Sequence, residues 1–186
     1  MVINRRTFAG VGLRIVGVAL ALLAQAAVAA AQESLRITPF VRDNQVLVTF
    51  TLNDAYNESV HEAIASGLKT TFTYELELRT IVPGWIDRTI AKTTVATSDQ
   101  YDNLTRRHTL TRTIDGRIEE VTVTEDEAAV KTWLTEWTRV QMCDTSKLDA
   151  TRDYYVRITT RTKPVGGSLL GLTRSVSGQA KFTFIP

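Results

Sequence analysis

The chain of 186 residues contains a single cysteine, Cys143, and only two histidines, His61 and His108. One cysteine excludes an internal disulfide, so packing must hold the fold together. Cys143 ends an apolar strand segment and has no histidine near it in sequence, which favours a small buried residue; a reactive or intermolecular thiol is the alternative. Two histidines are also few for a metal site, which needs three or four converging ligands.

Sequence motifs of nucleophilic catalysis are missing as well. The chain has neither a G-x-S-x-G elbow nor an H-E-x-x-H helix, and its glycine-rich segment lacks the lysine of a phosphate-binding loop. His61 falls among acidic residues on the polar side of an expected helix, and His108 alternates with Leu110 and Arg112 along an expected strand. We therefore expect no catalytic residue, no metal ligand and no cofactor, with His61 in a solvated helix face and His108 as a partly buried structural residue.

The N-terminal segment lacks acidic residues and differs in composition from the rest of the chain. Arg5, Arg6 and Arg14 accompany the apolar stretch 15–23, and the small residues 29–31 match a cleavage site. This pattern predicts a signal peptide over residues 1–31 and export to the periplasm. An uncleaved N-terminal anchor is the alternative. It is disfavoured because the strongly apolar part is only about half of the roughly 20 residues that span a bilayer. The secretory and twin-arginine routes both stay open.

The remaining residues, 32–186, are long enough for a single domain. The whole chain has 22 basic and 20 acidic residues, and removing the leader leaves 19 against 20. The exported domain is thus close to neutral and lacks the basic surplus typical of nucleic-acid binders. We expect no nucleic-acid partner.

Alternation of apolar and polar residues indicates that the domain is mainly β. Segments 35–41 and 46–52 alternate on either side of Asp43-Asn44, segment 71–79 alternates throughout, and Asp115-Gly116 predicts a hairpin turn. Residues 85–97, 104–114, 118–124, 139–143, 154–161 and 181–185 are predicted as further strands. Eight or nine strands exceed one comfortable sheet, so we expect a two-layer antiparallel β-sandwich, immunoglobulin-like in general architecture.

Two short helices interrupt the strands. The first is capped by Asn53 or Asp54 and ends near Gly67. The second begins with the capping box Thr124-x-x-Glu127 and carries an apolar stripe from Val130 to Trp137. This stripe is typical of a buried face, so both tryptophans of the stripe are expected in the core.

Two segments are candidate partner surfaces. The loop 166–172 is glycine-rich and apolar, and its leucines predict either a lid or membrane-surface contact, or simply a cover for the end of the sandwich. A basic group can recruit an anionic partner such as a lipid head group, although the acidic residues of the next strand can also neutralise it. The candidate residues are Leu169, Leu170, Leu172, Arg106, Arg107 and Arg112.

Several runs resemble one family in combination. They are the segment Leu35 to Asp43, Ala55-Tyr56, the segment Ser66 to Leu78, Trp85, Tyr101 to Leu104, and Asp115-Gly116. Together they resemble bacterial exported proteins grouped as domain of unknown function 4390, over most of the exported chain. His108 departs from the pattern, which has a tyrosine there. The resemblance implies a Gram-negative envelope location and a β-rich domain, and it supplies no catalytic residue.

We accordingly expect a non-enzymatic envelope module that binds an envelope protein or another envelope component. A carrier or sensor of an apolar ligand or lipid is the alternative, with Leu169, Leu170 and Leu172 closing an inter-sheet pocket lined by the tryptophans. A hydrolase is the third hypothesis, and it requires His61 or His108 beside a hydroxyl or carboxylate in a cleft. The sequence does not determine the oligomeric state.

Overall fold

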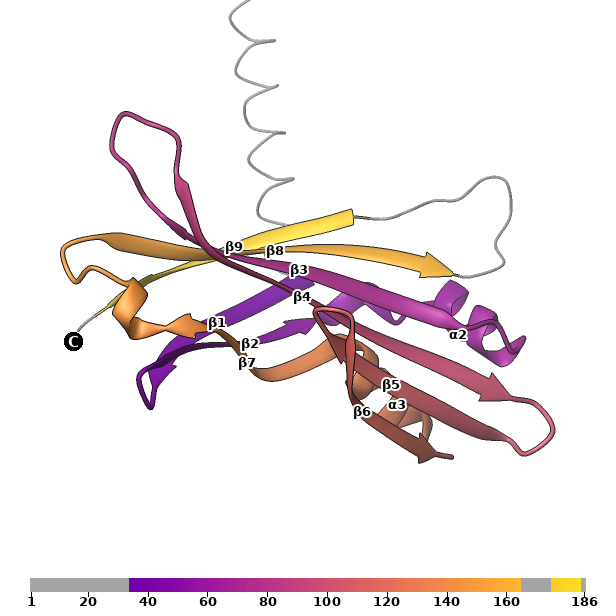
Figure 1. Ribbon diagram of the computed structural model, residues 1–186. Coiled ribbons are helices and arrows are strands. Elements are labelled where there is room, and N and C mark those ends of the chain that lie inside the picture. The colour runs from indigo at the N-terminus through magenta and orange to yellow at the C-terminus, as the bar shows by residue number, and fades with distance from the viewer. Residues whose placement is uncertain (1–33, 165–174, 185–186) are drawn as a thin grey trace, which may run out of the picture.

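Two antiparallel sheets pack face to face and form the body of the protein (Figure 1). The computed structural model describes residues 34–164 and 175–184. The strands are β1 (Leu35–Arg42), β2 (Gln45–Leu52), β3 (Thr70–Thr80), β4 (Arg88–Asp102), β5 (Arg107–Ile114), β6 (Arg117–Thr124), β7 (Glu136–Asp144), β8 (Asp153–Pro164) and β9 (Ser175–Thr183). The helices are α2 (Glu58–Ala65) and α3 (Glu127–Thr135), with 3-10 turns η1 (Asn53–Ala55) and η2 (Thr145–Lys147).

The small sheet has the strand order β1-β2-β7, and the large sheet has the order β6-β5-β4-β3-β8-β9. Every neighbouring pair is antiparallel. The prediction of a two-layer antiparallel β-sandwich with two short helices is therefore confirmed. Within the described residues, no helix is both long enough and apolar enough to cross a membrane.

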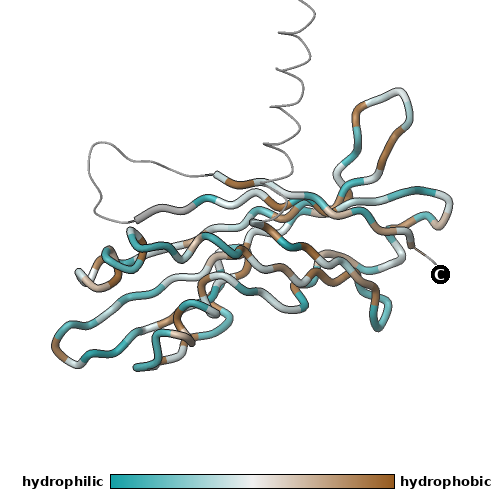
Figure 2. Tube along the Cα trace, turned by 180° about the vertical axis from the view of Figure 1, so that it is seen from behind, coloured by the Kyte–Doolittle hydropathy of each residue, from teal (hydrophilic) through white to brown (hydrophobic). Residues whose placement is uncertain are grey.

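The core lies between the sheets because the strands alternate in burial. Along β3 every second side chain is buried, from Phe72 to Leu78, and β2 shows the same period from Val46 to Leu52. The Phe50 and Tyr74 rings meet across the layers at a centroid distance of 4.9 Å. This is the burial pattern expected when one face of an antiparallel sheet packs and the other is wet. Figure 2 shows the corresponding mixture of polar and apolar residues along the strands.

Both helices begin later than the sequence patterns indicate. Asn57 caps α2, with its side chain accepting from the Val60 amide at 3.1 Å, while residues 53–55 form only a 3-10 turn. Asp126 caps α3, where its carboxylate accepts from the Ala128 amide at 2.9 Å. Thr124, the expected cap, instead accepts from the Asp126 amide. Aspartate and asparagine at these positions satisfy the first free amides, so the helix starts move to them.

Trp137 is a second correction to the expected helix. The helix ends at Thr135, and Trp137 lies in β7, although its side chain is buried as expected. The Tyr74 hydroxyl donates to the Leu134 carbonyl at 2.7 Å, and Thr97 Oγ1 donates to the Trp133 carbonyl at 3.2 Å. These side chains satisfy carbonyls at the helix end, which allows the chain to pass directly into a strand.

Two predicted strands also start later, and the large apolar residues left outside them, Trp85, Ile86 and Leu104, are exposed. β4 begins at Arg88 rather than Trp85, and β5 begins at Arg107 rather than Leu104. Leu104 lies in the β4–β5 turn, which the Asp102 carboxylate closes by accepting from the Leu104 amide at 2.8 Å. Short side-chain bonds of this kind favour a turn over a strand.

Candidate functional site

The most exposed aromatic side chain among the described residues lies on the β3–β4 hairpin. Trp85 is 81% exposed and the adjacent Ile86 is 78% exposed. They belong to residues 82–87, which we call the hairpin tip, and the hairpin projects away from the large sheet (Figures 1 and 2). Monomeric proteins carry scattered exposed apolar residues, but two large neighbours on a projecting loop mark a candidate contact surface.

The backbone of the hairpin tip is a tight turn encoded by Pro83-Gly84. The Trp85 amide donates to the Val82 carbonyl at 3.1 Å, and Gly84 has φ of 75°. Proline at the second position and glycine with positive φ at the third are the requirements of a type II turn. The turn therefore reverses the chain immediately before Trp85.

Asp87 fixes the base of the hairpin tip. Its carboxylate accepts from the Val82 amide at 3.2 Å and from the Tyr155 hydroxyl at 2.9 Å. Arg79 Nη2 donates to the Asp87 carbonyl at 2.8 Å. The Tyr155 and Val82 hydrogen bonds lower the pKa of Asp87. These bonds hold the base of the tip, and Trp85 and Ile86 are its two large apolar side chains exposed to solvent.

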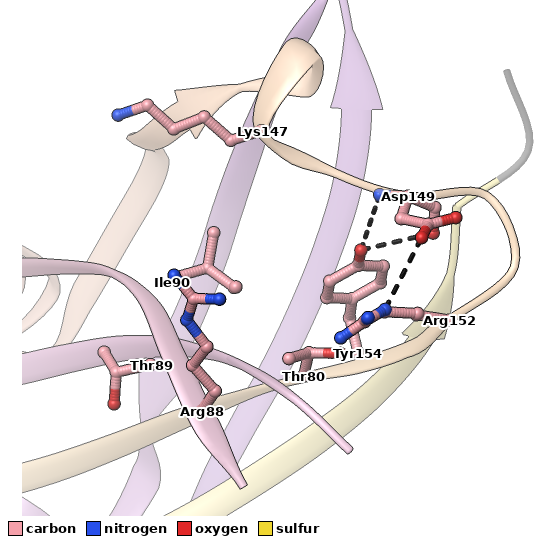
Figure 3. Close-up of a pocket in the computed structure, with 8 residues that line it drawn as sticks. All are labelled: Thr80, Arg88, Thr89, Ile90, Lys147, Asp149, Arg152 and Tyr154. Atoms are coloured by element: carbon pink, nitrogen blue, oxygen red, sulfur yellow. Dashed lines mark hydrogen bonds and ion pairs between the residues drawn. The ribbon is translucent and has the colours of Figure 1, made fainter. Parts of the chain in front are cut away.

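A pocket of about 380 Å³ lies at the same end of the molecule (Figure 3). Its lining residues are Thr80, Arg88, Thr89, Ile90, Lys147, Asp149, Arg152 and Tyr154. They come from the end of β3, the start of β4, η2, the connection from η2 to β8, and the start of β8. Three of its lining residues are cationic and one is a carboxylate, so we call it the basic pocket. Arg88 joins it to the hairpin tip because Arg88 follows Asp87 directly in the chain.

The carboxylate of the basic pocket is already engaged. Asp149 accepts from the Thr151 amide and hydroxyl at 2.9 and 2.7 Å, and it pairs with Arg152 at 3.4 Å. The Thr151 hydrogen bonds lower the pKa of Asp149. Arg88 and Lys147 have no ion-pair partner among the described residues. Two cationic side chains therefore remain to receive an anionic group in this pocket.

The three arginines predicted as an anion-binding group do not share one surface. Arg106 is exposed in the β4–β5 turn, and Arg107 Nε donates to Glu125 at 3.0 Å. Arg112 is turned inward, with its guanidinium 4.2 Å from the Trp133 ring centroid. Its Nη2 donates to the Glu136 carbonyl at 2.8 Å. Arg112 thus serves the end of α3, while Arg106 and Arg107 are exposed.

The other candidate surface cannot be placed. Leu169, Leu170 and Leu172, with the rest of the 166–172 loop, lie outside the described residues. The residues of the predicted signal peptide, 1–31, do so as well.

His61 has a different acidic partner from the one its helix suggests. Its Nδ1 lies 2.6 Å from Glu127 of α3 rather than beside Glu58 or Glu62. The Tyr56 hydroxyl donates to the same Glu127 oxygen at 3.3 Å. Burial and the Glu127 charge raise the pKa of Tyr56 to about 12. The three side chains join α2 to α3, and Tyr56 stays protonated across the physiological range.

His108 is buried, in agreement with its predicted structural role. Its Nδ1 lies 2.8 Å from Asp99, whose side chain is 0% exposed, and the Tyr101 ring stacks on it at 4.5 Å. Burial raises the pKa of Asp99. A carboxylate beside a histidine is part of what the hydrolase hypothesis requires, but none of the residues in these two histidine groups lines the basic pocket.

Other reactive groups among the described residues are engaged in structure. Cys143 is buried in β7, which confirms the favoured interpretation, and burial raises the pKa of its thiol. Ser66 and Lys69 have the spacing of an S-x-x-K pair, but Ser66 Oγ donates to the Ala63 carbonyl at the end of α2. No group of three or more His, Cys, Asp or Glu side chains suited to a metal ion occurs within residues 34–164 and 175–184.

The hairpin tip and the basic pocket are candidate contact features that sequence reasoning missed. The sequence pattern predicted one strand over residues 85–97, which placed Trp85 in a sheet. Pro83-Gly84 followed by two large apolar residues is, however, a signal for a turn with an exposed tip. The basic pocket left no local signal, because its cationic residues are separated by up to 64 positions in sequence.

Comparison with known sequences assigns the chain to a family. Residues 29–165 match the family described as domain of unknown function DUF4390, which covers most of the chain, and the protein belongs to this family. This confirms the resemblance drawn from the sequence. No curated protein and no solved structure matches the chain.

Proposed function

We propose that this DUF4390 domain is an exported, non-enzymatic binding module of the bacterial envelope, and that it contacts an envelope component with the hairpin tip and the basic pocket. The observation that carries the proposal is the exposure of Trp85 and Ile86 on a tip braced by Asp87. Aromatic side chains on rigid loops are the usual anchors of binding surfaces, because little conformational entropy is lost when they bind.

Export is supported by the leader of the sequence, with its arginines, apolar stretch and small residues at 29–31. The leading compartment is the periplasm, with an uncleaved N-terminal anchor as the alternative. The binding role is supported by the position of the basic pocket beside the tip, since a contact there adds charge recognition to apolar burial.

The carrier hypothesis has less support. It needs an apolar inter-sheet cavity lined by the tryptophans, whereas neither Trp133 nor Trp137 lines the basic pocket. Both rings lie against the Arg112 guanidinium instead. The hydrolase hypothesis has the two histidine–carboxylate contacts in its favour, but no serine or threonine hydroxyl forms a hydrogen bond to either histidine among the described residues.

Site-specific photo-crosslinking in cells tests the proposed contact surface. A benzophenone amino acid replaces Trp85 in one variant and Leu104 in a matched control, because Leu104 is 95% exposed at the opposite end of β4. We expect crosslinks to an envelope component, protein or lipid, from position 85 and none from position 104. Equal yields at both positions, or none at either, would contradict the proposed surface.

The same cells test export. We expect the crosslinked protein in the periplasmic or membrane fraction with the mass of residues 32–186. Recovery of the uncleaved chain in the membrane fraction would favour the anchor, and recovery in the cytoplasm would exclude export.

A further inference from the structure

The hairpin tip and the basic pocket offer two kinds of chemistry at one end of the molecule. The tip supplies apolar side chains, Trp85 and Ile86, and the pocket supplies Arg88 and Lys147 as cations without an ion-pair partner in the described part of the chain. In Figure 1 the β3–β4 hairpin and η2 lie at the same end of the sandwich, opposite α2 and the β4–β5 turn. A partner that contacts both features must therefore cover this end of the sandwich.

We propose that this end docks on a membrane containing anionic phospholipid, with Trp85 and Ile86 inserted at the interface and a lipid phosphate received by Arg88 and Lys147 in the basic pocket. This inference rests on the proposed function and names the partner of the same surface. Tryptophan prefers the boundary between hydrocarbon and headgroups, because its ring is apolar and its N–H group can still bond to water or phosphate.

The charges of this end favour a headgroup that carries phosphate. The carboxylate that lines the pocket and the one that precedes Arg88 are both engaged: Asp149 accepts from Thr151 and pairs with Arg152, and Asp87 accepts from Tyr155 and the Val82 amide. They offer little free acceptor capacity to compete with a phosphate for Arg88 and Lys147. A pocket of about 380 Å³ is large enough to admit a phosphate group with its glycerol.

Stable membrane attachment through a small apolar insertion requires a second attractive contribution. One short apolar segment gives only weak, reversible binding, and basic residues near an anionic surface add to it. The hairpin tip supplies only two large apolar side chains. The cationic residues are therefore needed as the second contribution, and they select anionic lipid. The association should therefore depend both on Trp85 and on the lipid charge.

Intrinsic fluorescence gives a direct test in the full-length protein. The chain has three tryptophans and none lies in residues 1–31, while Trp137 is buried and Trp133 is packed on Arg112. A shift of the emission on adding vesicles therefore reports on Trp85, whatever the leader does. We expect a blue shift with vesicles of phosphatidylglycerol and phosphatidylcholine, little shift with phosphatidylcholine alone, and no shift in Trp85→Phe.

Variants separate the two contributions in vesicle co-sedimentation. Trp85→Ser and the double variant Arg88→Gln, Lys147→Gln should each weaken binding to anionic vesicles about tenfold or more, a factor that corresponds to losing one good contact. The control Leu104→Ser, at the other end of β4, should bind as the wild type does. At about 1 M salt the Debye length is near 3 Å. This salt concentration should weaken the binding of the wild type to anionic vesicles but not the residual binding of the double variant.

The outcomes distinguish this inference from the proposed function. The membrane inference would be overturned by equal shifts of the Trp85 emission on neutral and anionic vesicles. It would also be overturned if neither set of substitutions changed binding to anionic vesicles. A protein crosslinked at position 85 without any vesicle-induced shift would also overturn it and leave the proposed function standing. If neither crosslinks at position 85 nor a vesicle-induced shift is observed, both the membrane inference and the proposed function are wrong. Because all substituted residues are exposed, unchanged thermal unfolding verifies that each variant is folded.

Discussion

Arg112 illustrates how the surroundings of a single residue set its role. In sequence it belongs to a basic run that suggests anion binding, yet its guanidinium lies over the Trp133 and Trp137 rings and donates to the Trp133 and Glu136 carbonyls. Burial lowers the pKa of Arg112, but arginine remains charged in this setting. Its positive charge stands at the negative end of α3, where it stabilises the last carbonyls.

Asp99 gives the first prediction at the residue scale. Burial raises the pKa of Asp99 above the ordinary carboxyl value, although the contact with His108 opposes the shift. The folded state therefore binds the Asp99 proton more tightly than the unfolded state, and this contribution to the free energy of unfolding is present at low pH and is lost as pH rises through the raised pKa. Asp99→Asn removes the titrating proton and keeps the shape.

We expect the wild type to lose stability relative to Asp99→Asn as pH rises above about 4, the ordinary range of a carboxyl group. Urea denaturation at a series of pH values measures the difference, and taking the difference cancels the titration of the distant exposed carboxylates. The control Asp126→Asn, which keeps a side-chain cap for α3, should show a smaller dependence. A difference that is constant between pH 4 and pH 8 would contradict the prediction.

At the scale of an element, the β3–β4 hairpin depends on one aspartate. Asp87 closes the hairpin tip by accepting from the Val82 amide, and it joins the tip to Tyr155 and Arg79. These bonds lie at the end of the long strands, so removing them should free the tip without disturbing the sheet. The lowered pKa of Asp87 means that the brace is present above the ordinary carboxyl range and is lost as pH falls through the folded pKa.

Asp87→Ala should therefore accelerate hydrogen exchange of the amides of residues 82–86 while the midpoint of thermal unfolding changes little. Exchange mass spectrometry measures both the tip and the core strands in one experiment. The variant Asp102→Ala, which opens the β4–β5 turn instead, serves as the control and should leave the exchange of residues 82–86 unchanged. Protection of these residues in Asp87→Ala would show that the tip is held by something else.

The edge strand β6 shows a second effect at the element scale. A bulge shifts its register with β5, so that Thr113 pairs with Ile118 while Arg112 pairs with Glu120. The shift places Ile118 on the same face as Val121 and Val123, and all three side chains are exposed. The bulge and the charged residues Arg117, Glu119 and Glu120 make the edge a poor template for another strand, as is common at sheet edges.

At the scale of the whole molecule, β1 of the small sheet packs on β9 of the large sheet at a residue that has no side chain. Gly178 of β9 faces β1, and a Cβ added there would lie 3.1 Å from Leu35 Cδ2 and 3.4 Å from Ile37 Cδ1. Gly178 is buried, so the neighbouring leucine and isoleucine fill the space above it. This close approach allows β1 of the small sheet to pack on the last strand of the large sheet.

Gly178→Val should push the sheets apart and lower the free energy of unfolding by about 1 to 3 kcal/mol, the usual cost of overpacking a filled core. Chemical denaturation measures the loss. Ser177→Val is the matched control, because it adds the same side chain on the exposed face of the same strand, and its effect should stay within about 0.5 kcal/mol. Equal effects of the two substitutions would argue against close packing at Gly178.

Local patterns in the sequence determined the fold class. The period of two along residues 46–52 and 71–79 identified the strands that form the middle of the two sheets, because burial on one face requires that alternation. Helix existence was equally clear, while the helix starts were displaced by two to four residues because several capping residues compete locally. The leader and the family resemblance also came from the sequence alone.

Only the tertiary structure decided which side chains act together. Arg88 and Arg152 line one pocket because antiparallel pairing brings the end of β3 and the starts of β4 and β8 to one end of the sandwich, and Lys147 joins them from η2, which follows β7 of the small sheet. His61 meets Glu127 of α3 rather than the glutamates of its own helix, and Arg112 turns to the two tryptophans. Such pairings depend on long-range packing, which no local pattern encodes. The sequence by itself determined the elements and the expected destination of the protein; the packing of the sheets determined its candidate contact surface.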